Sequence, residues 1–289
     1  MTTTPIHTLI ELARQHLAAG NALIASHCLD AALALEPNNL VAHNLREAHV
    51  LPGHYAGWMG VNAQISPDDD IFRFFAQHPT SRHALRDYLS DGWRTMTELQ
   101  ALMEQHGHAL GASQSFLEFA SGHGRFTRHL VQRLPAGTLS VSDVVPGSVD
   151  FLQNLLGVQG FYSTPDPDTL TLPQRYQHVF ALSLFSHLPE STWGAWLARL
   201  HGAVLPGGLL ILSTHGLKCA EQSGVQLQEG YAFFASSEST AIEGQVYGTT
   251  FTSPDYVTRT ARRVLGAQAQ VSLVPNHFWG NQDAVVIQA

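Results

Sequence analysis

The chain has 289 residues, of which 44% are hydrophobic and 13% are charged, so it can bury a large core and is neither disordered nor fibrous. Its formal net charge is -8 and Lys218 is its only lysine, which leaves no basic surface for a nucleic-acid backbone. Cys28 and Cys219 form no disulfide framework and show no metal-ligand spacing, so we expect a protein without a metal. No apolar run is long enough to span a membrane and no signal peptide is evident, so we expect it to be cytoplasmic.

Residues 5–50 are predicted to form two helices around a turn. Apolar residues recur at helical spacing on both sides of Gly20, and Pro37 ends the second helix. Small alanines where the helices meet make residues 1–50 similar to a single tetratricopeptide repeat, with no clear second copy. One such unit cannot bury its own apolar face. We therefore expect it to pack on the main domain or on a partner, either a second copy or another protein, and not to form a peptide-binding solenoid.

Residues 51–109 are predicted to be a linker and a helical cap. Glycines and prolines interrupt residues 51–68, and a helical pattern covers residues 83–106. Between these segments, the consecutive aspartates 68–70 precede an apolar run. We interpret them as the start of a helix, where negative charge favours the helix dipole, and not as a metal site.

From residue 110 onward, short apolar runs alternate with amphipathic stretches, which predicts a parallel sheet with helices on both faces. Two late runs, 271–274 and 284–287, have no helix between them and predict an antiparallel pair that closes the sheet. Residues 216–252 are predicted to be a structureless lid or substrate-recognition element. The other predicted strands are 116–119, 139–141, 178–184 and 209–213, and the predicted helices are 126–134, 193–204 and 253–266.

The segment from Glu118 to Gly124 lies between a predicted strand and a helix, where backbone amides can approach a nucleoside. Gly122 and Gly124 have no Cβ to obstruct that approach. A dinucleotide fingerprint would need a glycine in place of Thr127, and an acid at the head of the loop does not favour a pyrophosphate. NAD binding by a dehydrogenase is therefore the weaker interpretation. The Glu118 carboxylate suits a cationic ligand, such as a sulfonium that carries an ammonium group.

Two further segments are candidates for nucleoside contacts. Asp143 ends the second predicted strand, about 20 residues after the glycine loop, where an acid can accept hydrogen bonds from both ribose hydroxyls. Ser163, Thr164 and Asp166 follow the third strand and are placed to reach an adenine ring. The prolines beside them explain the same residues as an ordinary turn, so the choice among the three stays open.

Four segments, EFASGHGRFTRHL, SVSDVVP, YQHVFALSLFSHLP and VLPGGLLILSTHG, resemble the ordered motifs of class I AdoMet-dependent methyltransferases, including a Pro-Gly-Gly turn before the fifth strand. The resemblance covers about residues 110–289. It implies an α/β fold with a doubly wound, mostly parallel seven-stranded Rossmann-like sheet, here behind an N-terminal helical extension. It also implies S-adenosyl-L-methionine (AdoMet) as cofactor, bound by Glu118, Ala120, Gly122, Gly124, Asp143, Ser163, Thr164 and Ser183.

Two positions depart from the family pattern. Ala120 stands where the family usually has its first glycine, and Gln177 stands where many members have an acid. These departures keep open the alternative of a catalytically silent module with an AdoMet fold, used for assembly. The leading hypothesis is methyl transfer to an O or N nucleophile of a small metabolite, such as a sugar or glycoside. Nothing like the signature of amino-methylating nucleic-acid enzymes follows the fourth strand, where the chain reads ALSLFSHLP.

Methyl transfer depends mainly on alignment, and a base helps when a hydroxyl or a protonated amine loses its proton. His187 and His215 follow the fourth and fifth predicted strands, where the crevice of an open α/β sheet lies, and are the candidate bases. Other histidines are interpreted as solvated helix residues, namely His106, His108 and His129. The polar residues expected to contact the substrate are Glu238, Tyr247 and Asp283.

Overall fold

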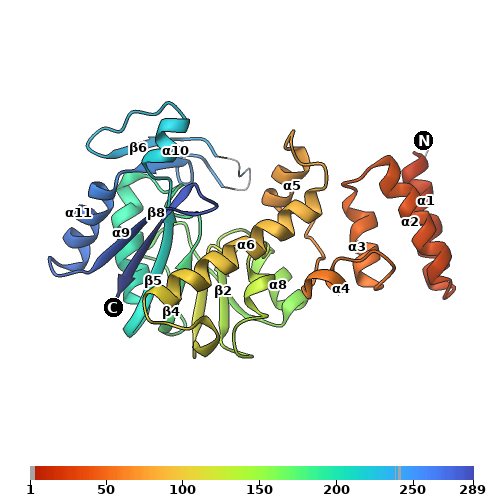
Figure 1. Cartoon of the computed structure of the whole chain (residues 1–289), viewed down its shortest axis with the longest axis horizontal. Helices are drawn as coiled ribbons and strands as arrows, with labels where there is room; N and C mark the ends of the chain where they lie inside the picture. Colours follow the sequence, from red (N-terminus) through yellow and green to blue (C-terminus); the bar gives the residue numbers. More distant parts are fainter. Residues whose placement is uncertain (1–3, 238, 240–241) are drawn as a thin grey trace. The chain divides into compact units, whose positions relative to one another are not determined.

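A computed structural model describes residues 4–237, 239 and 242–289 of the chain (Figure 1). The chain divides into two compact units, Met1–Gly92 and Trp93–Ala289. Among the described residues, no helix is both long and apolar enough to cross a membrane.

The first unit is helical, and its first two helices pack through small residues. Ala13, Ala25 and Ala32 are fully buried in one apolar cluster. The segment expected to hold two helices contains three, because the Asn39 side chain accepts a hydrogen bond from the Ala42 amide and starts another helix. The resemblance to a tetratricopeptide repeat and the docking role of this segment stay predictions. The helices that begin in this unit are α1 (Pro5–Ala18), α2 (Ala22–Leu35), α3 (Leu40–Ala48), α4 (Ala56–Met59), α5 (Asp70–Gln77) and α6 (Ala84–Gln105).

The acidic run of the first unit is the start of a helix, as the sequence predicted. One carboxylate oxygen of Asp69 accepts the amide proton of Phe72 at 2.9 Å and so caps α5. The other oxygen accepts the hydroxyl proton of Tyr88 at 2.6 Å. The next aspartate, Asp70, forms an ion pair with Arg73 one turn along α5.

The second unit contains a seven-stranded sheet in the order β3-β2-β1-β4-β5-β9-β8. The first five strands of this order are parallel, and β9 and β8 are antiparallel to their neighbours. This confirms the predicted doubly wound, mostly parallel sheet with an antiparallel pair at its edge. Its strands are β1 (Phe116–Phe119), β2 (Leu139–Asp143), β3 (Gln159–Tyr162), β4 (Tyr176–Ala181), β5 (Val204–Thr214), β8 (Val271–Phe278) and β9 (Gln282–Gln288).

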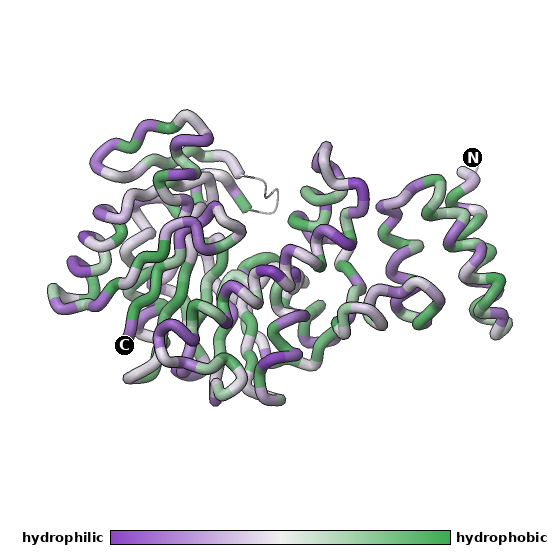
Figure 2. Tube along the Cα trace, in the orientation of Figure 1, coloured by the Kyte–Doolittle hydropathy of each residue, from purple (hydrophilic) through white to green (hydrophobic). Residues whose placement is uncertain are grey.

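Helices cover both faces of this sheet (Figure 1). Alternate strand residues point to opposite faces, so Leu117 and Val179 belong to one apolar core while Phe116 and Phe180 belong to the other. Helices α9 and α11 pack in the first core, whereas α8 and the second-unit part of α6 pack in the second. Figure 2 shows the central strands as largely apolar. The remaining helices of the unit are α7 (Thr127–Leu130), α8 (Ser148–Leu156), α9 (Glu190–Gly202), α10 (Leu217–Gln222) and α11 (Pro254–Leu265).

Two predicted elements of the second unit are wrong in detail. The helix expected over residues 126–134 is only the single turn α7, and tighter turns with hydrogen bonds between residues three apart follow it. The Pro-Gly-Gly turn expected before the fifth strand lies within β5, where its pairing with β4 shifts register. Gly208 lies against the Gln177 carbonyl, where a Cβ would overlap that oxygen, so the glycine permits close pairing of the strands.

Residues 216–252 are not structureless. They contain α10 and a two-stranded antiparallel sheet of β6 (Tyr231–Phe234) and β7 (Thr249–Thr252). The loop expected over residues 275–283 is also shorter than predicted, because β8 and β9 extend into it. In both segments the strands are defined by backbone hydrogen bonds between them, which hydrophobic periodicity cannot predict.

Candidate functional site

Glu118 lies at the carboxyl end of β1 and is buried. Burial, together with the smaller effect of the nearby Asp143 charge, raises the pKa of its carboxyl group to about 8, against the opposing effects of the Thr127 hydroxyl and Arg125. Among the described residues, its Oε2 atom has no hydrogen-bond partner. A buried carboxylate oxygen without a donor is costly unless a ligand supplies one. This atom therefore fits a cationic group such as the ammonium of AdoMet.

The loop after β1 depends on left-handed backbone conformations. Ala120 has φ +60°, which explains why a glycine is usual at this position in the family that the sequence resembles. Gly124 has φ +85°, and a Cβ there would overlap the side chain of Leu152 on α8. Ala120 thus adopts the left-handed conformation of the family's glycine, at a cost of about 1 kcal/mol in backbone strain.

Arg128, which the sequence analysis did not predict as a site residue, stabilises this loop through hydrogen bonds to its backbone. Its side chain is fully buried, and its guanidinium donates to the carbonyl oxygens of Gly124 at 2.8 Å and His123 at 3.3 Å. The neighbouring His129, predicted to be solvated, is buried as well, because α7 lies under the loop and not on the surface. Hydrophobic periodicity gives no signal for a buried arginine of this kind.

Asp143 ties the ends of β1, β2 and β3 together. Its carboxylate accepts the amide protons of Gly122 at 2.7 Å and Val145 at 2.8 Å, and its carbonyl oxygen accepts the amide proton of Ser163 at 2.9 Å. Burial raises the pKa of its carboxyl group, and these backbone donors act in the opposite direction. Each carboxylate oxygen has a second lone pair that can accept a ribose hydroxyl. The Thr164 hydroxyl donates within the following turn, to the Asp166 carbonyl oxygen at 2.7 Å.

The two candidate bases lie together at the carboxyl ends of β4 and β5. His187 is buried, with Nδ1 2.6 Å from the Gly248 carbonyl oxygen, and its ring stacks on Tyr247 with ring centroids 4.3 Å apart. His215 has Nδ1 3.2 Å from the Thr250 carbonyl oxygen. The centroids of the two imidazoles are 5.7 Å apart. The structure thus brings both predicted bases and one predicted substrate residue, Tyr247, into one cluster.

The small β6–β7 sheet is bound to this edge of the central sheet by backbone hydrogen bonds. The amide of Gly248 donates to the His187 carbonyl oxygen at 2.9 Å, and the amide of Thr250 donates to that of Ser186 at 2.7 Å. The amide of Thr252 donates to the His215 carbonyl oxygen at 2.8 Å. The small sheet within the segment predicted to be a lid is therefore fixed to the loop after β4 and to the end of β5.

Gln282, at the start of β9, is a site residue that the sequence did not indicate, because that strand was expected to begin two residues later. Its buried carboxamide contacts Ser183, Ser213 and His215. Ser183 has φ +57°, and its amide donates to the Ser213 hydroxyl at 2.7 Å. The predicted cofactor residue Ser183 is thus held in a left-handed turn by a polar network.

The other two predicted substrate residues are Asp283, beside the end of β5, and Glu238. Asp283 is buried, accepts the amide proton of Asn276 at 2.8 Å and packs so closely on Gly216 that a Cβ there would overlap its carboxylate. Burial raises the pKa of its carboxyl group. Glu238 lies outside the described residues. Among those described, no group of three or more His, Cys, Asp or Glu side chains is placed to hold a metal ion.

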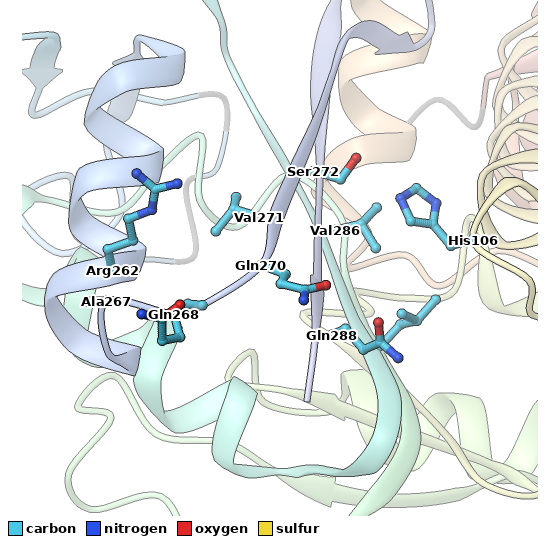
Figure 3. Close-up of a pocket in the computed structure, with 11 residues that line it drawn as sticks. His106, Arg262, Ala267, Gln268, Gln270, Val271, Ser272, Val286 and Gln288 are labelled. Atoms are coloured by element: carbon cyan, nitrogen blue, oxygen red, sulfur yellow. The ribbon is translucent and has the colours of Figure 1, made fainter.

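A separate hollow of about 500 Å³ lies near the amino end of β5 and is lined by both polar and apolar side chains (Figure 3). Leu209 and Gln288, which line it, pair with each other across β5 and β9. Because parallel strands of this type present ligands at their carboxyl ends, this hollow is not the nucleoside site.

No protein-family model matches the chain, and no curated protein matches its sequence. Solved structures do match it. An amino pentose methyltransferase from Micromonospora echinaspora, solved with SAM bound, is 13% identical, with a TM-score of 0.51 over 74% of this chain and 100% of that chain. An S-adenosylmethionine-dependent methyltransferase from Clostridium acetobutylicum is 9% identical, with a TM-score of 0.49 over 68% and 92% of the two chains. An O-methyltransferase family protein from Burkholderia thailandensis is 16% identical, with a TM-score of 0.49 over 86% and 70%.

The likeness to the amino pentose methyltransferase confirms the fold that the sequence motifs implied. The chain has the Rossmann-like fold of AdoMet-dependent methyltransferases, with helical residues added at its N-terminus.

Proposed function

We propose that the chain is an AdoMet-dependent methyltransferase that acts on an O or N nucleophile of a small metabolite. The observation that carries this proposal is the buried Oε2 atom of Glu118, which has no protein donor among the described residues and stands at the head of a strand-loop-helix segment. A cationic ligand with an N–H donor would supply the missing hydrogen bond and favour the ionised carboxylate. NAD has no ammonium group to play this part.

The residues around Glu118 fit the other parts of the same cofactor. Asp143 would accept the ribose hydroxyls, and the backbone around Ala120, Gly122 and Gly124 would approach the ligand closely. Further contacts are proposed for Ser163 and Thr164 at the adenine and for Ser183 beside the transferred group. When bound, AdoMet supplies a methyl group on a positively charged sulfur, so the protein's main task is to align the acceptor with it.

His187 is the better placed of the two candidate bases. A carbonyl oxygen can only accept, so Nδ1 of His187 donates to Gly248 and its Nε2 carries the lone pair that can take a proton. The two ring nitrogens of His215 contact Thr250 and Gln282. His187, which stacks on the predicted substrate residue Tyr247, is the proposed proton acceptor, and His215 is the second candidate. Tyr247, stacked on His187, is the proposed acceptor contact.

The acceptor is proposed to be a small sugar or glycoside. One solved protein of the same fold is an amino pentose methyltransferase, and the formal net charge of -8 disfavours a nucleic-acid acceptor. The two departures from the family pattern do not disturb the carboxyl ends of the strands, where the nucleoside is proposed to bind. Ala120 adopts the required left-handed conformation. Gln177 lies at the opposite end of the sheet, where its side chain accepts the Gln114 amide proton. A catalytically silent module is thus less well supported than an enzyme.

Calorimetry with the purified protein tests this proposal. AdoMet and its demethylated product should bind and NAD should not. Micromolar binding of NAD, about -8 kcal/mol, without any AdoMet signal would overturn the assignment. A screen of sugars and other metabolites with methyl-labelled AdoMet then separates the enzyme from the silent module, which would bind the cofactor without turnover of any acceptor.

A further inference from the structure

The hollow beside β5, β9 and β8 has a floor that the strand register defines (Figure 3). Leu209 on β5 pairs with Gln288 on β9, and Val286 on β9 pairs with Ser272 on β8. Paired residues, and residues two apart in a strand, point to the same face of a sheet, so all four side chains share one face. Leu209 and Val286 are buried, whereas Gln288 and Ser272 are exposed. The floor therefore combines apolar and polar side chains.

Side chains from three other segments complete the lining of this hollow. His106 directly follows α6, Arg262 belongs to the last turn of α11, and Gln268 and Gln270 lie in the loop before β8. All of these residues belong to the second unit. The volume of about 500 Å³ lies within the range of roughly 300 to 1,000 Å³ that sites for small molecules occupy.

The charge of the lining is opposite in sign to that of the chain. The described residues that line the hollow include Arg262 and no aspartate or glutamate, although the formal net charge of the chain is -8. Arg259, three residues earlier on α11, donates to the Glu229 carbonyl oxygen at 2.9 Å. Arg262 forms no hydrogen bond or ion pair with another described residue, so its donors are available to a ligand. A guanidinium can bind a carboxylate or phosphate through two parallel hydrogen bonds.

The other polar groups of the lining suit hydroxyl groups. Nδ1 of His106 lies 2.9 Å from the Leu102 carbonyl oxygen, which can only accept, so Nδ1 donates. In the neutral ring, Nε2 is then left to accept a hydroxyl proton. The carboxamides of Gln270 and Gln288 can each donate and accept. A ligand that carries both an oxyanion and several hydroxyl groups would therefore use the whole lining.

We propose that this hollow is a second small-molecule site, which binds a sugar that carries a phosphate or carboxylate group. Arg262 binds the oxyanion, and His106, Gln270 and Gln288 contact the hydroxyl groups. In the order of the sheet, β8 is the fourth strand from β1, which separates the site from Glu118 by about 19 Å at ~4.8 Å per strand. The ligand therefore takes no part in the proposed methyl transfer, and the inference does not depend on whether AdoMet binds.

Calorimetry with the full chain, without AdoMet, tests the proposal with glucose 6-phosphate, glucuronate, glucose and inorganic phosphate. At least one of the two acidic sugars should bind with a Kd of about 1 mM or tighter, and comparison of the two shows which oxyanion fits. Glucose and inorganic phosphate should each bind about tenfold more weakly, because each lacks one part of the contacts. No binding of either acidic sugar would overturn the proposal. Inorganic phosphate that binds as tightly as the acidic sugar would reduce the site to an adventitious anion site and would also overturn it.

Two substitutions at exposed positions connect the binding to the hollow without disturbing the core. Arg262→Gln should weaken binding of the acidic sugar about tenfold or more, because a hydrogen bond to a charged group is lost. Ser272→Phe fills part of the floor and should abolish binding. Arg263→Gln removes the same charge from the next residue of α11, which does not line the hollow, and should bind like the wild type. Unchanged affinity in Arg262→Gln, or an equal loss in Arg263→Gln, would refute the site.

Amide NMR of the full chain locates the bound sugar. Addition of the acidic sugar should shift the backbone amide signals of residues 268–272 and of Gln288. Shifts confined to Gly122 and Asp143 would instead place the sugar at the carboxyl ends of β1 and β2 and would contradict a second site.

Discussion

The two ends of the parallel sheet both bury histidines, and they differ in what those histidines contact. At the amino end, His178 contacts the Ser113 hydroxyl through Nδ1 and lies 2.9 Å from Nδ1 of His108 through Nε2. At the carboxyl end, His187 and His215 lie near residues in left-handed conformations and on the same edge as Glu118, whose Oε2 has no partner among the described residues. Buried polar groups alone therefore do not mark the site. At the carboxyl end they coincide with a buried carboxylate oxygen that lacks a donor and with the left-handed backbone of Ala120 and Ser183.

The largest expected effect comes from the carboxyl end. His187→Ala should lower methyl transfer by roughly 10²-fold or more, because the acceptor's proton loses its base, while AdoMet affinity stays nearly unchanged. Turnover should be measured from pH 6 to 9 once an acceptor is known. Wild-type turnover across this range would end the assignment, and a loss confined to His215→Ala would transfer the role to the end of β5.

A smaller effect is expected for Asp143, whose carboxylate holds the loops after β1 and β2. Asp143→Ala removes the acceptor of the Gly122 and Val145 amides and of the ribose hydroxyls. AdoMet affinity should fall by about 1.5 to 3 kcal/mol, as is typical for hydrogen bonds to a charged group. Calorimetry of the folded variant measures this loss. Affinity equal to that of the wild type would show that the ribose does not bind at the end of β2.

At the amino end of the parallel sheet, a change of pH should alter the free energy of unfolding and not the binding of a ligand. Burial lowers the pKa of His178 to about 4, and desolvation also lowers that of His108. Because the unfolded chain binds these protons more readily, this stability is present above about pH 6.5 and is lost as the pH falls toward 4, by at most ~1.4 kcal/mol per unit for each histidine. Urea unfolding at several pH values measures the slope. His178→Leu should flatten it, and an unchanged slope would contradict the account.

The smallest effect concerns strain in the loop after β1. Ala120→Gly removes the cost of a left-handed alanine, so the free energy of unfolding should rise by about 0.5 to 1 kcal/mol with the cofactor site intact. Thermal unfolding is a suitable measurement. A decrease in stability would mean that the alanine methyl contributes more through packing than its backbone costs.

The sequence predicted the parts of this site that depend on position along strands. Glu118 and Asp143 lie at the carboxyl ends of buried strands, at a spacing that places them on one edge of the sheet, and the alternation of elements indicated the sheet around them. It did not indicate Arg128, because hydrophobic periodicity gives no signal for a buried arginine that binds the carbonyl oxygens four and five residues before it. It did not indicate Gln282 either, because the hydrogen bonds of that side chain join segments far apart in the chain. The left-handed turn at Ser183 was likewise invisible, since a serine carries no signal for that conformation.

The proton state of Glu118 tests the central claim most directly. With the pKa of its carboxyl group raised to about 8, AdoMet should bind more tightly as the pH rises from 6 to 7, by up to tenfold, because the ammonium group requires the ionised carboxylate. Glu118→Gln should weaken binding at pH 7 and abolish this dependence in calorimetry. A variant that binds AdoMet as tightly as the wild type, with the same pH dependence, would contradict the account.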